Sequence, residues 1–192
     1  MLLDFHGKNP KIAPDVFIAP DAVIIGDCEI KPGSTILFGV LIRADVNRVT
    51  IGPMSNIQDL TVIHGDESEP PVVLGSRVTV GHRAIVHGCT IEDEAMVGMG
   101  AIILNRAKIG KNSIVAAGSV VKEEFVVPPG TLVAGIPAQI KRELKPEEIE
   151  WLKKVAAGYY RLGEKYRALK ADQTPAPSPG PQPSRQPHPE SG

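Results

Sequence analysis

An aliphatic residue recurs at every sixth position through most of this 192-residue sequence. Neither an α-helix, with 3.6 residues per turn, nor a strand of an ordinary hairpin sheet, with a period of two, repeats in this way. A period of six is typical of a solenoid, in which very short strands stack coil upon coil. The recurring residues are Ile12, Ile18, Ile24, Ile30, Ile36, Ile42, Ile51, Ile57, Ile63, Leu74, Val80, Val86, Ile91, Val97, Ile103, Ile109, Val115, Val121, Val127 and Val133.

Three irregularities interrupt this period. Three extra residues follow Ile42, a loop at about residues 66–71 adds five, and the step from Val86 to Ile91 is one residue short. A small or β-branched residue stands two positions before most of the aliphatic residues, and alternate residues of a strand point to the same side. These inward residues include Ala22, Cys28, Ser34, Thr61, Val78, Ala84, Ala95, Ala101, Ser113 and Ser119.

We therefore predict a mainly β fold, a parallel β-helix over residues 1–140 with three hexapeptides in each triangular coil of 18 residues. Once the insertions are subtracted, one coil separates Ile42 from Ile63, and one coil separates Ile63 from Val86. The residues that follow them, Arg43, His64 and His87, should form an outward column. Because stacked strands lie about 4.8 Å apart, His64 and His87 could bind one metal ion.

His82 belongs to another side of the triangle, in register with Asp59. It could complete the site only from a neighbouring subunit, and three histidines with one open position are the ligand set of a catalytic zinc site. The alternative is that these are ordinary surface histidines. That alternative is preferred for His6 and His188, which lie outside the pattern.

Several motifs of the sequence resemble those of the γ-class carbonic anhydrases, and most closely those of the short bacterial branch. The resemblance covers about residues 5–170. It implies a left-handed coil, although the general rule for parallel crossovers would favour the right hand. The matching motifs are Arg43-Ala-Asp45, Asn56-Ile-Gln58-Asp59, His64, Gly81-His82, Val86-His87-Gly88 and Gly135-Ile-Pro-Ala138.

The resemblance implies reversible hydration of CO2 to bicarbonate by a metal-bound hydroxide. It implies a homotrimer in which His64 and His87 of one chain and His82 of the next bind Zn²⁺ at each interface, with Fe²⁺ or Co²⁺ as alternatives. Gln58 would orient the hydroxide, with Asn56 in the same network.

The resemblance also implies that Arg43, Asp45 and Asp59 form an ion-pair cluster between subunits. This cluster could help bicarbonate bind or could serve the interface alone.

The sequence departs from the long members of the family at two places. Val46 stands where the long members carry a glutamate, and the acidic loop is shortened to Asp66-Glu67-Ser68-Glu69. Glu67 is the candidate proton shuttle in that loop. Tyr159 matches a helical tyrosine that reaches toward the site, with packing as its alternative role.

Past the coils the period becomes helical, and we predict an amphipathic helix packed on the solenoid within residues 141–170, with Pro146 in its first turn. Gly158 and Gly163 weaken it in isolation, so packing must supply most of its order. Residues 171–192 hold seven prolines and are predicted to be a disordered tail. The helical apolar residues are Ile149, Leu152, Val155, Ala156, Tyr159, Leu162, Tyr166 and Leu169.

Composition excludes several other classes of function. With 21 basic and 22 acidic residues the chain has no bias toward nucleic acid, and no apolar run approaches the roughly 18 residues of a membrane span. No signal peptide is evident, and Cys28 and Cys89 occupy inward positions, so we expect reduced thiols and a cytoplasmic location.

Two rival functions remain open from the sequence. One is a trimeric scaffold that keeps the metal without catalysis. The other is a coenzyme A-dependent acyltransferase, a common activity among hexapeptide-repeat proteins. Acyltransferases of this kind use an unligated histidine as general base and usually a projecting loop, whereas the loop here is short and acidic.

Overall fold

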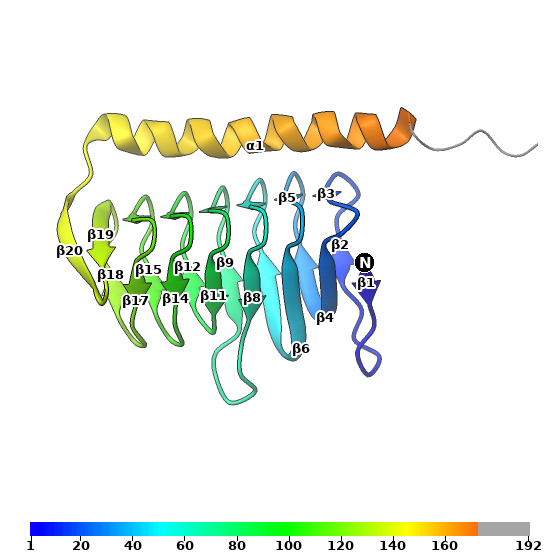
Figure 1. Ribbon diagram of the computed structural model, residues 1–192, viewed down its shortest axis with the longest axis horizontal. Helices are drawn as coiled ribbons and strands as arrows, with labels where there is room; N and C mark the ends of the chain where they lie inside the picture. Colours follow the sequence, from blue (N-terminus) through cyan, green and yellow to red (C-terminus); the bar gives the residue numbers. More distant parts are fainter. Residues whose placement is uncertain (173–192) are drawn as a thin grey trace, which may run out of the picture.

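The computed structural model describes residues 1–172 as a triangular β-solenoid of about seven turns with one long helix beside it (Figure 1). The helix α1 spans Pro146–Asp172. An eight-stranded sheet forms one side of the triangle. Its strands are β3 (Phe17–Ile18), β5 (Thr35–Ile36), β7 (Asn56–Ile57), β10 (Thr79–Val80), β13 (Met96–Val97), β16 (Ile114–Val115), β19 (Thr131–Gly135) and β20 (Ala138–Glu143).

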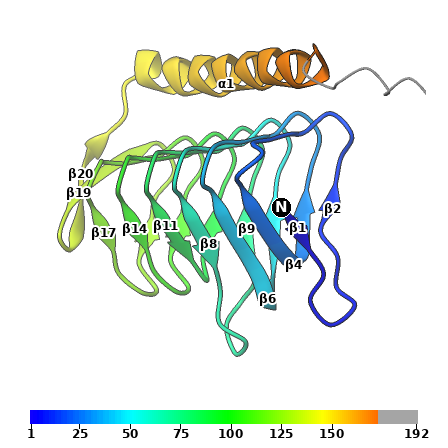
Figure 2. The ribbon, with the colours of Figure 1, turned by 45° about the vertical axis from the view of Figure 1, so that its right-hand side comes forward.

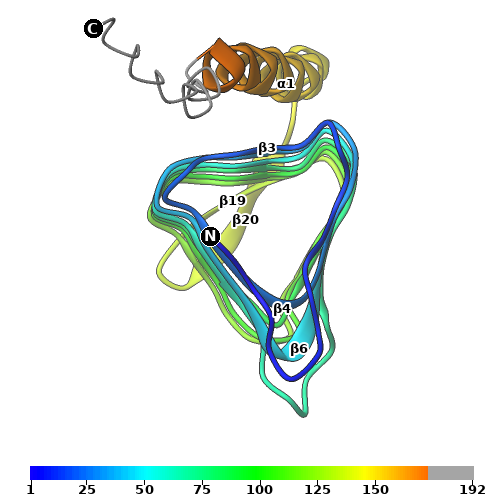
Figure 3. The ribbon, with the colours of Figure 1, turned by 90° about the vertical axis from the view of Figure 1, so that its right-hand side faces the viewer.

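A twelve-stranded sheet forms the other two sides, because the long strands β4 and β6 bend from one side to the next (Figure 3). Viewed from its N-terminal end, the chain turns anticlockwise as it recedes, so the coil is left-handed. The strands are β1 (Leu2–Leu3), β2 (Lys11–Ile12), β4 (Val23–Ile30), β6 (Leu41–Ile51), β8 (Val62–His64), β9 (Val72–Leu74), β11 (Ile85–His87), β12 (Thr90–Ile91), β14 (Ile102–Ile103), β15 (Lys108–Ile109), β17 (Val120–Val121) and β18 (Val126–Val127).

The strand register confirms the predicted stacking. Ile42 pairs with Ile63, and Ile63 pairs with Val86, so that Arg43, His64 and His87 follow one another in the next column. On the eight-stranded side Ile57 pairs with Val80, as expected. The aliphatic residues of these columns are fully buried and form the core with the small residues that precede them.

Cys28 and Cys89 are both buried in this core, as their inward positions predict. Burial raises the pKa of each thiol to about 12, so both stay protonated at neutral pH.

The two largest insertions project from the same corner of the triangle. The three extra residues lengthen β6 relative to β4, with a shift of register between Gly26 and Cys28. The second insertion forms the loop of residues 65–71, between β8 and β9. Figure 3 shows both at the lower corner. Strand β8 ends at His64, just before the loop, and β11 ends beside it at His87. This corner therefore gathers polar side chains that the regular coils do not carry.

Helix α1 lies along the eight-stranded side, parallel to the solenoid axis (Figures 1 and 2). Leu152 and Ala156 are buried against it. Tyr166 stacks on Phe17 with ring centroids 5.0 Å apart, and the Thr35 hydroxyl donates to the carbonyl oxygen of Tyr159 at 3.1 Å. The helix thus packs on the solenoid of its own chain.

The predicted boundaries of the C-terminal segment differ from the structure at both ends. Residues 141–143 belong to β20, which pairs antiparallel with β19 and covers the edge of the last coil. The helix begins at Pro146, where the Glu148 carboxylate accepts the Lys145 backbone N–H at 2.8 Å. Residues 171 and 172 end α1, and the rest of the predicted tail lies outside the described residues. No helix in the described part is both long and apolar enough to cross a membrane.

The two glycines of α1 provide a test of this packing. A Cβ at Gly158 would meet nothing within 4 Å, whereas one at Gly163 would lie 2.5 Å from the Thr35 hydroxyl oxygen. We expect Gly158→Ala to raise the free energy of unfolding by roughly 0.5–1 kcal/mol. Gly163→Ala should lower it by about 1–3 kcal/mol through overpacking. Denaturant unfolding measures both, and equal stabilisation by the two substitutions would contradict the packing.

Candidate metal centre

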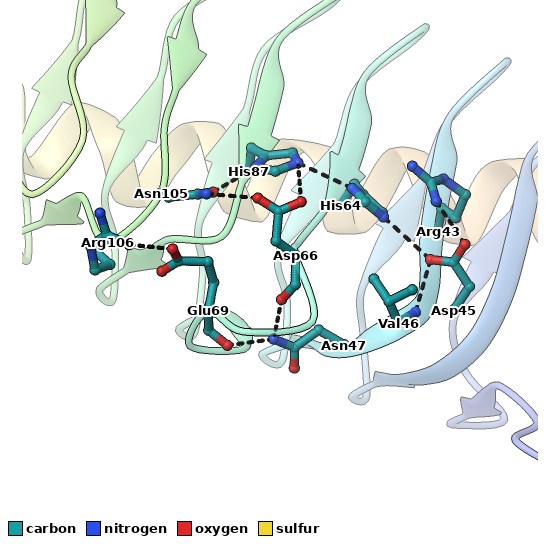
Figure 4. A network of polar contacts seen from close by, with 10 residues as sticks. All are labelled: Arg43, Asp45, Val46, Asn47, His64, Asp66, Glu69, His87, Asn105 and Arg106. Atoms are coloured by element: carbon teal, nitrogen blue, oxygen red, sulfur yellow. Dashed lines mark hydrogen bonds and ion pairs between the residues drawn. The ribbon is translucent and has the colours of Figure 1, made fainter.

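Two imidazole rings meet where strands β8 and β11 end. His64 and His87 are the last residues of these paired strands, so their side chains leave the solenoid side by side. His64 Nδ1 lies 3.1 Å from His87 Nε2 (Figure 4). Two ligand atoms bound to one tetrahedral cation at about 2.0–2.1 Å would lie about 3.3 Å apart. The pair is therefore in position to share an ion.

The far nitrogen of each ring is held by an oxygen. His64 Nε2 lies 3.2 Å from Asp45 Oδ1, and His87 Nδ1 lies 2.6 Å from Asn105 Oδ1. The Asn105 amide nitrogen donates to Asp66 Oδ2 at 2.8 Å, which fixes the orientation of the amide. Because these oxygens can only accept, the ring protons lie on the far nitrogens. Two lone pairs then face each other across 3.1 Å, an arrangement that a cation between them would relieve.

The surroundings of His64 favour the neutral form of its imidazole. Burial lowers the pKa of the His64 imidazole, and the nearby Arg43 guanidinium lowers it further, against the opposing effect of Asp45. Burial alone would raise the pKa of Asp45, but hydrogen bonds from Arg43 and from the Val46 backbone N–H lower it overall. A neutral imidazole beside an ionised carboxylate is the state in which a histidine binds a metal.

The third potential ligand in the same chain is Asp66. Ligand atoms of His64, Asp66 and His87 all lie within 4.8 Å of one another. The sequence reasoning singled out Glu67 in this loop and missed both Asp66 and Asn105. Asn105 lies in the next coil, but Val86 pairs with Ile103, so Asn105 falls one residue beyond the position opposite His87 and counting alone would not have singled it out.

His82 lies on another side of the triangle, just after β10. Its Nδ1 is 2.7 Å from Asp59 Oδ2, in the register predicted from the sequence. The carboxylate holds the ring proton on Nδ1 and leaves Nε2 available as a ligand. The side chain is 40% exposed. His82 does not join the His64–His87 group within the chain, so it could reach such a pair only in another subunit.

Gln58 and Tyr159 lie beside His82 at a cavity of about 360 Å³ between α1 and the solenoid. Gln58 is 5% exposed. Its amide nitrogen donates to Asn56 Oδ1 at 3.1 Å, and the Asn56 amide nitrogen donates to Thr79 Oγ1 at 2.9 Å. The predicted contact between Gln58 and Asn56 is therefore present. Burial raises the pKa of the Tyr159 phenol, and the Asp59 carboxylate acts in the same direction.

The predicted cluster of Arg43, Asp45 and Asp59 is divided between two places within one chain. Arg43 Nη1 donates to Asp45 Oδ2 at 2.7 Å beside His64. Asp59 is paired with His82 instead. Arg43 and Asp45 could meet Asp59 only across a contact between two subunits, so the predicted intersubunit cluster stays a prediction. Glu67 is exposed in the loop, and its role as a proton shuttle stays a prediction.

Comparison with known proteins identifies relatives along most of the chain. The family model described as bacterial transferase hexapeptide (six repeats) matches residues 88–123. The carbonic anhydrase of Geobacillus kaustophilus is 38% identical over 91% of this chain and 95% of its own length. The mitochondrial gamma carbonic anhydrase 2 of Arabidopsis thaliana is 42% identical over 85% of this chain, which spans 60% of that relative's length.

A solved structure shares the fold and much of the sequence. A hexapeptide transferase family protein from Anaplasma phagocytophilum superimposes with a TM-score of 0.84 and is 39% identical, covering 86% of this chain and 98% of the other. Identity of 38% across nearly the whole bacterial relative, together with the γ-class relative from the plant, shows that the chain belongs to the γ-class carbonic anhydrase family of hexapeptide-repeat proteins.

Proposed function

We propose that this protein catalyses the reversible hydration of CO2 to bicarbonate at a divalent-cation site shared between the subunits of a homotrimer. Zn²⁺ is the preferred ion, with Fe²⁺ or Co²⁺ as alternatives, because imidazole ligands suit all three. The observation that carries the proposal is the pair of imidazole nitrogens 3.1 Å apart, with both ring protons held on the opposite nitrogens.

His64 and His87 would hold the ion from one subunit, and His82 would hold it from the next. The support for His82 is its 40% exposed side chain and the Asp59 carboxylate, which holds the ring by Nδ1 and leaves Nε2 available. Three protein ligands leave one position open, as in catalytic zinc sites. When bound, the cation lowers the pKa of water to about 7 and so supplies a nucleophile at neutral pH.

The polar residues near His82 would orient the reactants. Gln58 donates its amide N–H to Asn56, so its amide oxygen remains free to accept a hydrogen from the attacking water. Asn56 is in turn fixed by Thr79, which keeps the Gln58 amide from rotating. Arg43 would attract the bicarbonate product, because Asp45 engages only one of its terminal nitrogens. Glu67 remains the candidate to pass a proton to buffer.

The location proposed for this chemistry is the cytoplasm. Its support is that Cys28 and Cys89 are buried and unpaired in the core, as thiols of a reducing compartment commonly are.

Two alternatives keep specific support. Val46 and the short acidic loop depart from the longer members of the family, which favours a metal-binding scaffold without catalysis. The match to a transferase hexapeptide model favours an acyltransferase. The hydrogen bonds that direct the free nitrogens of His64 and His87 toward each other argue against these two histidines as its general base, because a general base needs a nitrogen directed at its substrate.

Removing either histidine of the pair tests the site and the activity together. We expect His64→Ala and His87→Ala each to lose the bound ion and to reduce CO2 hydration to the buffer rate, because each chain then supplies only one imidazole of the pair. Elemental analysis and stopped-flow hydration of anaerobically purified protein measure both, with His6→Ala as the matched control. Metal-loaded wild-type protein with no rate above buffer would favour the scaffold.

The role of Gln58 separates catalysis from metal binding. Gln58→Ala should keep the full metal content and lower kcat on the order of 10²-fold, because one preorganised hydrogen bond is lost. Gln139, which is exposed on β20, provides the control substitution Gln139→Ala. An unchanged kcat in Gln58→Ala would remove Gln58 from the mechanism.

Asn105 should act on the metal through His87. Asn105→Leu removes the oxygen that holds His87 Nδ1–H, and we expect metal affinity to fall by about 10–100-fold, the usual effect of losing such a partner. Asn105→Asp keeps an accepting oxygen and should recover most of the affinity. Competition titration of Co²⁺ against a chelator measures the metal affinity of the wild-type protein and of both variants. Wild-type affinity in Asn105→Leu would contradict this role of Asn105.

A further inference from the structure

We propose that Asp66 is a cation ligand from the same subunit, so that a single chain binds the ion through His64, His87 and Asp66 before His82 of a neighbouring subunit reaches it. This inference rests on the proposed cation site. Asp66 would hold the ion until His82 of the neighbouring subunit replaces it, so that one coordination position stays open in the assembled site. The inference also implies that a chain can bind the ion before the subunits assemble.

The distances around the histidine pair fit a third ligand at Asp66. Asp66 Oδ1 lies 4.0 Å from His87 Nε2, and the two ring nitrogens lie 3.1 Å apart. The spacing expected around a tetrahedral ion is about 3.3 Å, between these two values. All three ligand atoms lie within 4.8 Å of one another, so a side-chain movement of about 1–2 Å would bring them to bonding distance. Histidine with aspartate is a ligand set that Zn²⁺ accepts.

The two oxygens of Asp66 are already divided between two roles. Oδ2 accepts the Asn105 amide N–H at 2.8 Å. Oδ1 faces His87 (Figure 4). Since Asn105 also holds the far nitrogen of His87, one amide orients two members of the proposed ligand set. This is the kind of outer hydrogen bonding that accompanies ligands in metal sites.

The backbone around Asp66 is held by residues outside the loop. The Asn47 amide nitrogen donates to the carbonyl oxygens of Asp66 at 2.9 Å and of Glu69 at 2.6 Å. Arg106 forms an ion pair with Glu69. These contacts come from β6 and from the turn after β14, so the loop is fixed before any ion binds. Little ordering entropy would remain to oppose ligation by Asp66.

The experiment uses the full chain and removes the intersubunit ligand first. In His82→Ala, one Co²⁺ or Zn²⁺ per chain should still bind, measured by competition with a chelator. Adding Asp66→Ala should weaken binding by at least about tenfold, because losing a ligand costs no less than losing its outer partner. The Co²⁺ absorption spectrum should change in the double variant, and circular dichroism of the metal-free proteins checks their folding.

Glu67→Ala in the same His82→Ala background is the matched control, since it removes an equal charge from the adjacent position. It should leave the affinity within twofold. Equal effects of Asp66→Ala and Glu67→Ala would overturn the inference, and so would complete loss of the ion in His82→Ala alone. The proposed function would survive either result. It would fail separately if His64→Ala bound the ion as tightly as the unmodified protein.

Discussion

The parallel register between β8 and β11 is the constraint on which the candidate site depends. Ile63 and Val86 are fully buried in adjacent coils, and a slip of one residue would turn both outward. The residues that follow them, His64 and His87, therefore leave the solenoid at a separation set by strand spacing. The geometry of the metal pair is thus a consequence of core packing and not of the loops around it.

The same stacking supplies the groups that hold each ring. Asn105 stands one coil beyond His87, and Asp59 stands in register with His82 on the adjacent coil. Asp45 reaches His64 from β6, the strand that pairs with β8 on the side away from β11. Neighbouring coils of a solenoid can therefore supply an outer layer of hydrogen bonds for a metal site. Each of His64, His82 and His87 has an oxygen partner at one ring nitrogen, which leaves the other nitrogen available as a ligand.

The sequence predicts the regular part of this protein well and the irregular parts less well. A period of six is enough to align His64 with His87 and His82 with Asp59, because stacking follows from counting. The direction of Asp66 does not follow from counting, since it depends on side-chain anchors at Asn47 and Arg106 that come from other coils. Strand β20 was missed for a similar reason, because it pairs antiparallel and lies outside the period.

The most direct test is anomalous diffraction from crystals of the protein loaded with Zn²⁺ or Co²⁺. We predict one strong peak per chain, within about 2.0–2.1 Å of His64 Nδ1 and His87 Nε2 and of His82 Nε2 from a neighbouring subunit. A peak bound elsewhere, or a loaded protein whose His64 and His87 hold no ion, would contradict it.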